Sequence, residues 1–190
     1  AQDDIFILGG GTNILIGDRG FDGLVIHNKI EGIEKEGDSL VIGSGTMIRY
    51  LLEFCIENSL SGLEWAGGLP GTIGGAIRGN AGAFKGEIKD NVVQVKSLSI
   101  RQAQDKVQSE IIRSNAECNF GYRNSIFKSG EAITEFITHV VLALTIGDKD
   151  EIRAKILQKI DYRNNRHPMD YPNIGSTFKN IPLDSLSQNL

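Results

Sequence analysis

Apolar residues in the first half of the chain occur in short runs separated by glycine and aspartate. The runs are IFIL at 5–8, NILI at 13–16, LVIHN at 24–28 and SLVIG at 39–43. Short segments rich in branched aliphatic residues and bounded by turn formers are typical of β-strands. Three further strands are predicted in the second half, at 91–100, 106–112 and 133–146.

Two segments have helical periodicity instead. Residues 46–59 carry Ile48, Leu51, Leu52, Cys55 and Ile56 at the i, i+3, i+4 spacing of one helix face, with Thr46 as the predicted N-cap. Residues 150–164 place Ile152, Ile156, Leu157 and Ile160 on one face. A capping box from Ser114 to Glu117 predicts a short helical turn. Because the strands come in runs and do not alternate with helices, the pattern predicts an α+β fold.

Glycine interrupts this pattern at two places. Residues 68–86, GLPGTIGGAIRGNAGAFKG, contain seven glycines, and residues 9–13 read GGGTN. Clustered glycine is unfavourable in helices and strands, so both segments are predicted to be irregular backbone that a ligand can approach closely. Successive main-chain amides in such loops bind phosphate oxygens.

Each glycine segment also has an alternative interpretation without a ligand. GGGTN could be a simple hairpin turn. The longer segment could be a linker, although its apolar residues, such as Leu69, Ile73 and Ile77, disfavour that. The Rossmann pattern G-x-G-x-x-G fails at Ile14, and the chain has no Walker A sequence, so a phosphate cradle here belongs to another fold.

Composition narrows the possible classes of function. The 190 residues carry a net charge of -4, with a pI near 5.4, which disfavours a nucleic-acid surface. The sequence has no apolar run of membrane-spanning length and no signal-peptide pattern at its start, which predicts a cytoplasmic protein without a membrane partner.

Cys55 and Cys118 lack C-x-x-C spacing, so neither a structural metal nor a disulfide is expected. The start at Ala1, close to an apolar run, suggests truncation at the N-terminus.

Four motifs occur in a recognisable order: ILGGGTNILI, GLEWAGGLPGTIGGAIRGNAGAFKGEI, FGYRNSIFK and YRNNRHPMDYPNIGSTFKN. Together they resemble the UDP-N-acetylenolpyruvoylglucosamine reductases of bacterial peptidoglycan synthesis. The resemblance implies a vanillyl-alcohol-oxidase type of fold, in which two α+β subdomains hold FAD and a substrate domain follows. On this basis residues 1–170 are the FAD-binding region, with an incomplete first subdomain. Residues 171–190 begin a substrate-binding domain that is mostly absent, so the chain is truncated at both ends.

The reaction that the resemblance implies reduces UDP-N-acetylglucosamine enolpyruvate to UDP-N-acetylmuramate. NADPH reduces FAD, and the reduced flavin then transfers a hydride to the substrate, a UDP-sugar. The expected enzyme is a cytoplasmic monomer. The residues that the resemblance places around FAD are Gly9, Gly10, Gly11, Thr12, Asn13, Pro70, Gly71, Thr72, Gly74, Gly75, Asn80, Ala81 and Gly82.

The resemblance also implies catalytic and substrate-binding residues. Arg123 matches the arginine that stabilises the developing enolate, and Ser176 matches the serine that protonates the carbanion. Without the motifs, Arg123 could be a surface arginine and Ser176 a turn residue. Residues that match substrate neighbours are Tyr122, Arg163, Arg166, Lys179 and Asn180. Arg163 and Arg166 could equally interact with a helix C-terminal dipole. The family's C-terminal glutamate cannot be assigned in a sequence that stops at Leu190.

Two other functions remain open on the sequence. One is a flavin oxidase of the same fold that acts on alcohols or hydroxy acids. Many such oxidases attach FAD covalently through histidine, and His27, His139 and His167 lie outside the glycine segments. The other is a catalytically inactive FAD-binding fragment.

Overall fold

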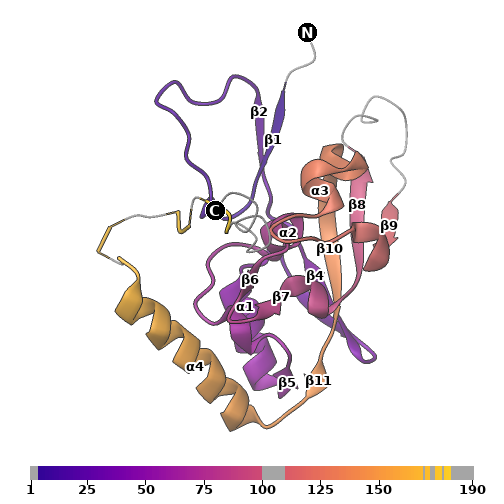
Figure 1. Cartoon of the computed structure of the whole chain (residues 1–190). Helices are drawn as coiled ribbons and strands as arrows, with labels where there is room; N and C mark the ends of the chain where they lie inside the picture. Colours follow the sequence, from indigo (N-terminus) through magenta and orange to yellow (C-terminus); the bar gives the residue numbers. More distant parts are fainter. Residues whose placement is uncertain (1–3, 100–109, 169, 172–173, 177, 181–190) are drawn as a thin grey trace, which may run out of the picture.

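A five-stranded antiparallel sheet, on the right in Figure 1, is the largest sheet in the described residues. The computed structural model describes residues 4–99, 110–168, 170–171, 174–176 and 178–180. In spatial order the strands of the sheet are β3 (Ile33–Glu36), β4 (Ser39–Gly43), β10 (Glu135–Ala143), β8 (Val92–Ser99) and β9 (Ile111–Ser114). The mixture of this sheet with four α-helices confirms the predicted α+β class.

Helices pack against the sheet and build one hydrophobic core. The helices are α1 (Ile48–Glu57), α2 (Ile73–Gly79), α3 (Ile126–Ser129) and α4 (Lys149–Arg166). Ile42 and Val140 of the central strands are fully buried in the same cluster as Ile73 and Ile77 of α2. Fully burying an aliphatic side chain of this size contributes about 1.5 to 3 kcal/mol. The glycine-rich segment is therefore fixed to the core through its own apolar residues.

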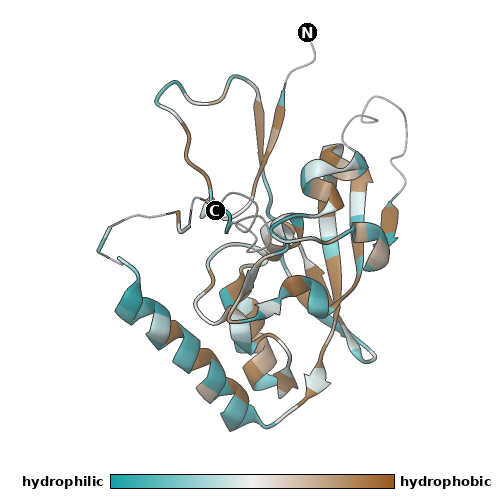
Figure 2. Cartoon of the chain, in the orientation of Figure 1, coloured by the Kyte–Doolittle hydropathy of each residue, from teal (hydrophilic) through white to brown (hydrophobic). Residues whose placement is uncertain are grey.

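Smaller elements lie around this core. β1 (Ile5–Leu8) and β2 (Leu24–His27) form a parallel pair that projects from the rest of the structure (Figure 1). Leu24 and Val25 of this pair are exposed, and both strands are largely hydrophobic in Figure 2. The remaining short elements are β5 (Leu60–Ser61) paired with β11 (Thr145–Ile146), β6 (Gly82–Ala83) paired with β7 (Gly86–Glu87), and the 3-10 turns η1 (Glu64–Ala66), η2 (Ile88–Asp90), η3 (Ala116–Cys118) and η4 (Glu131–Thr134).

The last helix, α4, is mostly polar, as the predominance of teal along it in Figure 2 shows. Asp148 caps it by accepting hydrogen bonds from the amides of Asp150 and Glu151 at 3.0 and 2.9 Å. Its contact with the core comes through the buried Ile152 and Ile156 and the partly buried Ile160. Leu157, predicted on the same face, is 50% exposed. Within the described ranges, the chain has no helix with the length and hydrophobicity needed to cross a bilayer.

Several predicted elements were wrong in detail. Residues 13–16 do not form a strand: they pair with no other described segment, and Leu15 is 87% exposed. Thr46 does not cap α1, because its hydroxyl bonds to the main chain of Gly32, and Met47 occupies the cap position. The strand predicted at 133–146 is divided between β10 and β11. The strand predicted at 106–112 falls partly outside the described residues, and its described part is β9.

The largest correction concerns the long glycine segment, part of which is the helix α2. Gly74 allows this helix to approach the chain after β4, since a Cβ at Gly74 would lie 2.9 Å from the carbonyl oxygen of Ser44. The capping box from Ser114 to Glu117 is confirmed, with the Glu117 carboxylate accepting from both the amide and the hydroxyl of Ser114.

One ion pair links three strands of the sheet and makes its stability depend on pH. Burial alone would raise the pKa of Glu135, but hydrogen bonds from Arg113 and Ser97 outweigh burial and lower it. Because the folded-state pKa is depressed below the unfolded value of about 4.3, this stabilisation is present above that pH and is lost as the pH falls through the folded-state pKa.

We therefore expect Glu135→Gln to lower the free energy of unfolding by about 1 to 3 kcal/mol at pH 7. The difference from the wild type should shrink in the acid range below about pH 4, where Glu135 itself becomes protonated. Urea unfolding of both proteins at several pH values measures this. A difference that stays constant down to the lowest pH would contradict the assignment.

Candidate functional site

The first glycine segment is a turn with unused main-chain donors. Residues 9–13 follow β1 directly, and Gly11 has a φ of +68°. Among the residues that the structure describes, the amides of Gly9 to Asn13 donate no hydrogen bond. Five successive amides without internal partners are what an anion-binding loop requires.

The second segment contributes two more amides of the same kind. Gly71 has a φ of +103°, and both Gly71 and Thr72 are buried. Other polar groups of these two residues have partners. The Gly71 carbonyl accepts a hydrogen bond from the Ile48 amide at 2.9 Å, and the Thr72 hydroxyl accepts one from the Gly75 amide at 3.4 Å. Their own amides have no partner in the described part of the chain. Because most buried amides in proteins are hydrogen-bonded, these two indicate a ligand site.

The two glycine segments lie against each other. A Cβ at Gly10 would lie 3.1 Å from the Cα of Gly71, and a Cβ at Gly71 would lie 2.9 Å from the Thr12 hydroxyl. A Cβ at Gly9 would similarly lie 2.8 Å from the Thr72 hydroxyl. Glycine is therefore needed here for close approach between two backbones. The contact collects free amides and two hydroxyl groups from distant parts of the sequence into one site.

The N-terminus of α2 does not add free donors to this site. The amides of Ile73 and Gly74 bond to the carbonyls of Thr46 and Ser44, both at 2.9 Å. The next two helical amides, those of Gly75 and Ala76, bond to the Thr72 hydroxyl and carbonyl. The anion-binding capacity therefore resides in the two turns and not in the helix end.

A second cluster of predicted residues surrounds Arg123. This residue lies between Gly121 and Asn124, whose main chains exchange hydrogen bonds at 3.0 and 3.1 Å. The Arg123 guanidinium donates to the carbonyl oxygens of Gly82 and Asn80 at 2.6 and 3.5 Å. It forms no ion pair with any carboxylate in the described residues, so its charge remains available to an anionic ligand.

A cavity of about 250 Å³ opens beside this arginine. Its lining residues are Gly82, Ala83, Lys85, Gly86, Glu87, Tyr122 and Arg123. The carboxylate here, Glu87, pairs with Lys89 at 2.8 Å, and the hydrogen bond from Lys89 lowers its pKa. A carboxylate that is already paired leaves Arg123 and Lys85 as the cations that line the cavity. Neither Glu87 nor Lys89 was singled out from the sequence, because only the fold brings them near Arg123.

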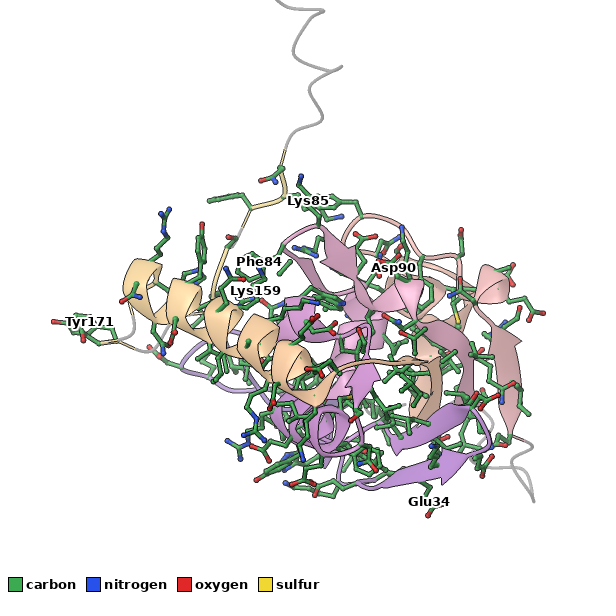
Figure 3. The ribbon with its side chains drawn as sticks, turned by 90° about the horizontal axis from the view of Figure 1, so that it is seen from below. Glu34, Phe84, Lys85, Asp90, Lys159 and Tyr171 are labelled. Carbon is green, nitrogen blue, oxygen red and sulfur yellow. The ribbon has the colours of Figure 1, made fainter. Side chains whose placement is uncertain are left out.

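The turn between β6 and β7 presents Phe84 toward α4. Phe84 and Lys85 have φ values of +49° and +69°, the left-handed conformation of a two-residue hairpin turn. Figure 3 shows Phe84 close to Lys159, whose ammonium lies 4.9 Å from the Phe84 ring centre. Tyr162 packs edge-on against the same ring at 5.1 Å.

The predicted substrate residues on α4 have structural partners. Arg163 donates from Nε to the Gly67 carbonyl at 2.9 Å and lies over the Phe84 ring, and burial lowers its pKa. Its Nη2 atom is buried without a hydrogen bond in the described structure. Arg166 lies over Tyr162, 4.7 Å from the ring centre. Arg163 thus anchors α4 to Gly67, directly before the second glycine segment, a contact that helical spacing alone does not reveal.

The C-terminal residues Ser176, Lys179 and Asn180 are exposed. The described residues contain no hydrogen bond between Ser176 and Arg123. Lys179 is nevertheless electrostatically close to this cluster, since burial together with the charges of Lys179 and Arg78 lowers the pKa of Lys128. Lys128 in turn donates to the Arg123 carbonyl at 3.0 Å. The structure therefore places the charge of Lys179 near Lys128 and leaves Ser176 exposed to solvent.

The three histidines do not bond to the glycine segments within the described residues. His27 ends β2, opposite Leu8 and next to the first turn. His139 is half buried in β10, and His167 is exposed after α4.

Comparison with known proteins gives a family and near relatives. The FAD binding domain family matches residues 1–101. A UDP-N-acetylenolpyruvoylglucosamine reductase from Caldanaerobacter subterraneus is 36% identical over 178 residues, and one from Geobacillus thermodenitrificans is 37% identical over 177 residues. The matches cover 93% of this chain but 56% and 55% of those relatives, so the chain spans about half the length of the curated relatives it matches. These relatives confirm the resemblance drawn from the four motifs.

Solved structures agree with this. The UDP-N-acetylenolpyruvylglucosamine reductase from Thermus caldophilus aligns with a TM-score of 0.74 and 27% identity, over 95% of this chain and 63% of that protein. A cholesterol oxidase from Brevibacterium sterolicum aligns with a TM-score of 0.52 and 14% identity, over 75% of this chain and 30% of that protein, which indicates a shared fold alone. The predicted fold type and the expectation of FAD as cofactor are both confirmed. The chain belongs to the FAD binding domain family.

Proposed function

We propose that the full-length protein is a UDP-N-acetylenolpyruvoylglucosamine reductase, which uses NADPH and FAD to convert UDP-N-acetylglucosamine enolpyruvate to UDP-N-acetylmuramate. The observation that carries the proposal is the meeting of two amide-rich glycine turns on the same chain that holds an unpaired arginine beside a cavity. The names of the curated relatives support the substrate. We further propose that the enzyme is a cytoplasmic monomer.

The two glycine turns fit the diphosphate of FAD. Free amides at 9–13 and at 71–72 offer donors to several oxygens of one dianion, and the absence of side chains lets the ligand reach them. We propose that FAD contacts Gly9, Gly10, Gly11, Thr12, Asn13, Pro70, Gly71, Thr72, Gly74, Gly75, Asn80, Ala81 and Gly82. Asn80 is the exception within this set: the whole residue is buried, so we propose that it supports the contacts of its neighbours Ala81 and Gly82. Bound FAD supplies the hydride that the reaction requires.

Arg123 fits the role of stabilising the enolate. The substrate carries a carboxylate next to the carbon at which negative charge develops, and a planar guanidinium can bind such a group through two hydrogen bonds. Charge-assisted hydrogen bonds contribute about 1.5 to 3 kcal/mol each. Tyr122 lines the same cavity, and we propose that it contacts the substrate together with Arg163, Arg166, Lys179 and Asn180.

We propose that Ser176 donates the proton that completes the reduction, with Lys179 stabilising the alkoxide that remains. Proton transfer from a positioned side chain contributes about 10²- to 10⁴-fold to a rate. Ser176 lies in the segment 171–190 that we propose begins the substrate domain, after a FAD-binding region at 1–170. Ser176 is exposed in this structure, and we propose that the substrate domain brings it to the substrate.

Ser176→Ala is therefore expected to slow substrate turnover by about 10²-fold or more while leaving flavin reduction by NADPH nearly unchanged. Anaerobic stopped-flow measurement of the two half-reactions separates these rates. Equal losses in both would refute the role of Ser176.

Purified full-length protein tests the function as a whole. We expect a flavin spectrum that bleaches with NADPH under anaerobic conditions and recovers when the enolpyruvyl nucleotide is added. Bleaching without recovery would contradict the reductase, and flavin that stays on the polypeptide after denaturation would favour a covalent oxidase. The absence of any flavin spectrum after reconstitution with FAD would contradict both.

A further inference from the structure

The turn that carries Arg123 is strained. Arg123 has a φ of +54°, in the left-handed region that costs a residue with a side chain about 1 to 2 kcal/mol. Within the described ranges, two main-chain hydrogen bonds, both between Gly121 and Asn124, close the turn. Such a conformation persists only where the surrounding structure holds it.

Asn80, from a different part of the sequence, provides this support through hydrogen bonds. Its side chain is fully buried, with 0% exposure, and its Nδ2 donates to the Gly121 carbonyl at 2.9 Å. Its Oδ1 accepts from the Lys89 amide at 3.3 Å, so both ends of the amide group are used. The main-chain carbonyls of Asn80 and Gly82 accept the Arg123 guanidinium. Asn80 therefore contacts the first residue of the turn through its side chain and the end of the arginine through its backbone.

The carboxylate nearest to Arg123 in this cavity, that of Glu87, has another partner. Lys89 pairs with Glu87 at 2.8 Å, and the hydrogen bond from Lys89 lowers the pKa of that carboxyl. A carboxylate paired with Lys89 competes less for the guanidinium. Arg123 accordingly bonds to neutral carbonyl oxygens and keeps its positive charge for a ligand.

We propose that Asn80 is a positioning residue for Arg123, acting through the Gly121 carbonyl. The proposal rests on the proposed role of Arg123 in stabilising the substrate. Without the Nδ2 donor, the turn loses its buried attachment and the guanidinium samples orientations in which its donors miss the developing charge. Misplacement of a reacting group by about 1 Å can cost on the order of 10²-fold in rate.

Asn80→Gly removes both side-chain hydrogen bonds and suits the backbone, because Asn80 has a φ of +43° that glycine adopts freely. In full-length holoenzyme we expect reoxidation by the enolpyruvyl nucleotide to slow by about 10- to 100-fold, with little change in flavin reduction by NADPH. Asn80→Asp keeps the acceptor for Lys89 and loses the donor to Gly121, so it should slow the same half-reaction. It serves as the second variant if the glycine variant folds poorly.

Asn119→Gly is the matched control. Asn119 has a φ of +45°, is exposed, and makes no side-chain hydrogen bond in the described residues. The same substitution in the same backbone conformation should leave both half-reactions at wild-type rates.

Two further measurements distinguish positioning from general support of the fold. In an Arg123→Ala background, Asn80→Gly should cause little additional loss, because the residue it positions is gone. Hydrogen exchange should show faster exchange of the Asn124 amide, which bonds to Gly121, in Asn80→Gly but not in Asn119→Gly.

Independent, additive losses in the double variant, equal slowing of both half-reactions, or unchanged Asn124 exchange would each overturn the proposal. If Arg123→Ala alone leaves reoxidation unaffected, the proposed role of Arg123 fails, and with it the positioning proposal; Asn124 exchange then still reports whether Asn80 holds the turn.

Discussion

Replacing Arg123 with alanine is expected to slow reoxidation of the reduced flavin by the enolpyruvyl nucleotide by about 10²- to 10³-fold, the usual effect of removing a donor to a developing negative charge. Flavin reduction by NADPH should change little, because the hydride donor brings no enolate to stabilise. The expectation follows from a guanidinium that lines the cavity and has no carboxylate partner in the described structure.

Arg123→Lys refines this experiment. Lysine keeps the charge but lacks the planar fork that binds two carboxylate oxygens at once, so we expect only partial recovery of the rate. Arg153→Ala is a suitable control, since Arg153 is an exposed arginine of α4 without a described partner. Anaerobic stopped-flow of both half-reactions provides the measurement. A rate in Arg123→Ala equal to that of Arg153→Ala would remove Arg123 from the mechanism.

The second large effect is expected from Gly10→Val. A Cβ at this position would lie 3.1 Å from the Cα of Gly71, so valine must separate the two turns. Separation prevents both sets of amides from reaching one diphosphate. If about two charge-assisted hydrogen bonds are lost, at about 1.5 to 3 kcal/mol each, the Kd for FAD should rise at least about 100-fold.

Gly17→Val controls for the general effect of valine in an exposed loop. No atom lies within 4 Å of a Cβ at Gly17, so this variant should keep wild-type affinity for FAD. Titration of the apoprotein with FAD, followed by quenching of flavin fluorescence, measures both variants. Equal Kd values for the two would show that contact between the turns is not required for binding.

The sequence predicted most of the fold where hydrophobic periodicity is strong. The helix at 48–57 and the core strands of the central sheet follow from their apolar spacing. Periodicity failed at 13–16, where an apolar run has no partner strand in the described residues, and the exposure of Leu15 reflects that. β3 was not predicted because its sequence, IEKE, is largely charged, and its pairing with β4 decides its conformation.

Part of the candidate site was also predictable from a local sequence pattern. Glycine clustering predicted that the main chain would be closely approached, and the contact between Gly10 and Gly71 agrees with that. The atoms that approach Gly10 most closely belong to a second backbone, that of Gly71. The attachment of Arg163 to Gly67 and that of Asn80 to Gly121 depend on contacts across about 96 and 41 positions of sequence, which no local pattern encodes.

A crystal structure of the full-length protein with FAD tests the central claim most directly, because it locates the diphosphate. The account predicts that its oxygens lie within about 2.7 to 3.2 Å of amides from both residues 9–13 and residues 71–72. A diphosphate held by only one of the two turns, or by neither, would contradict it.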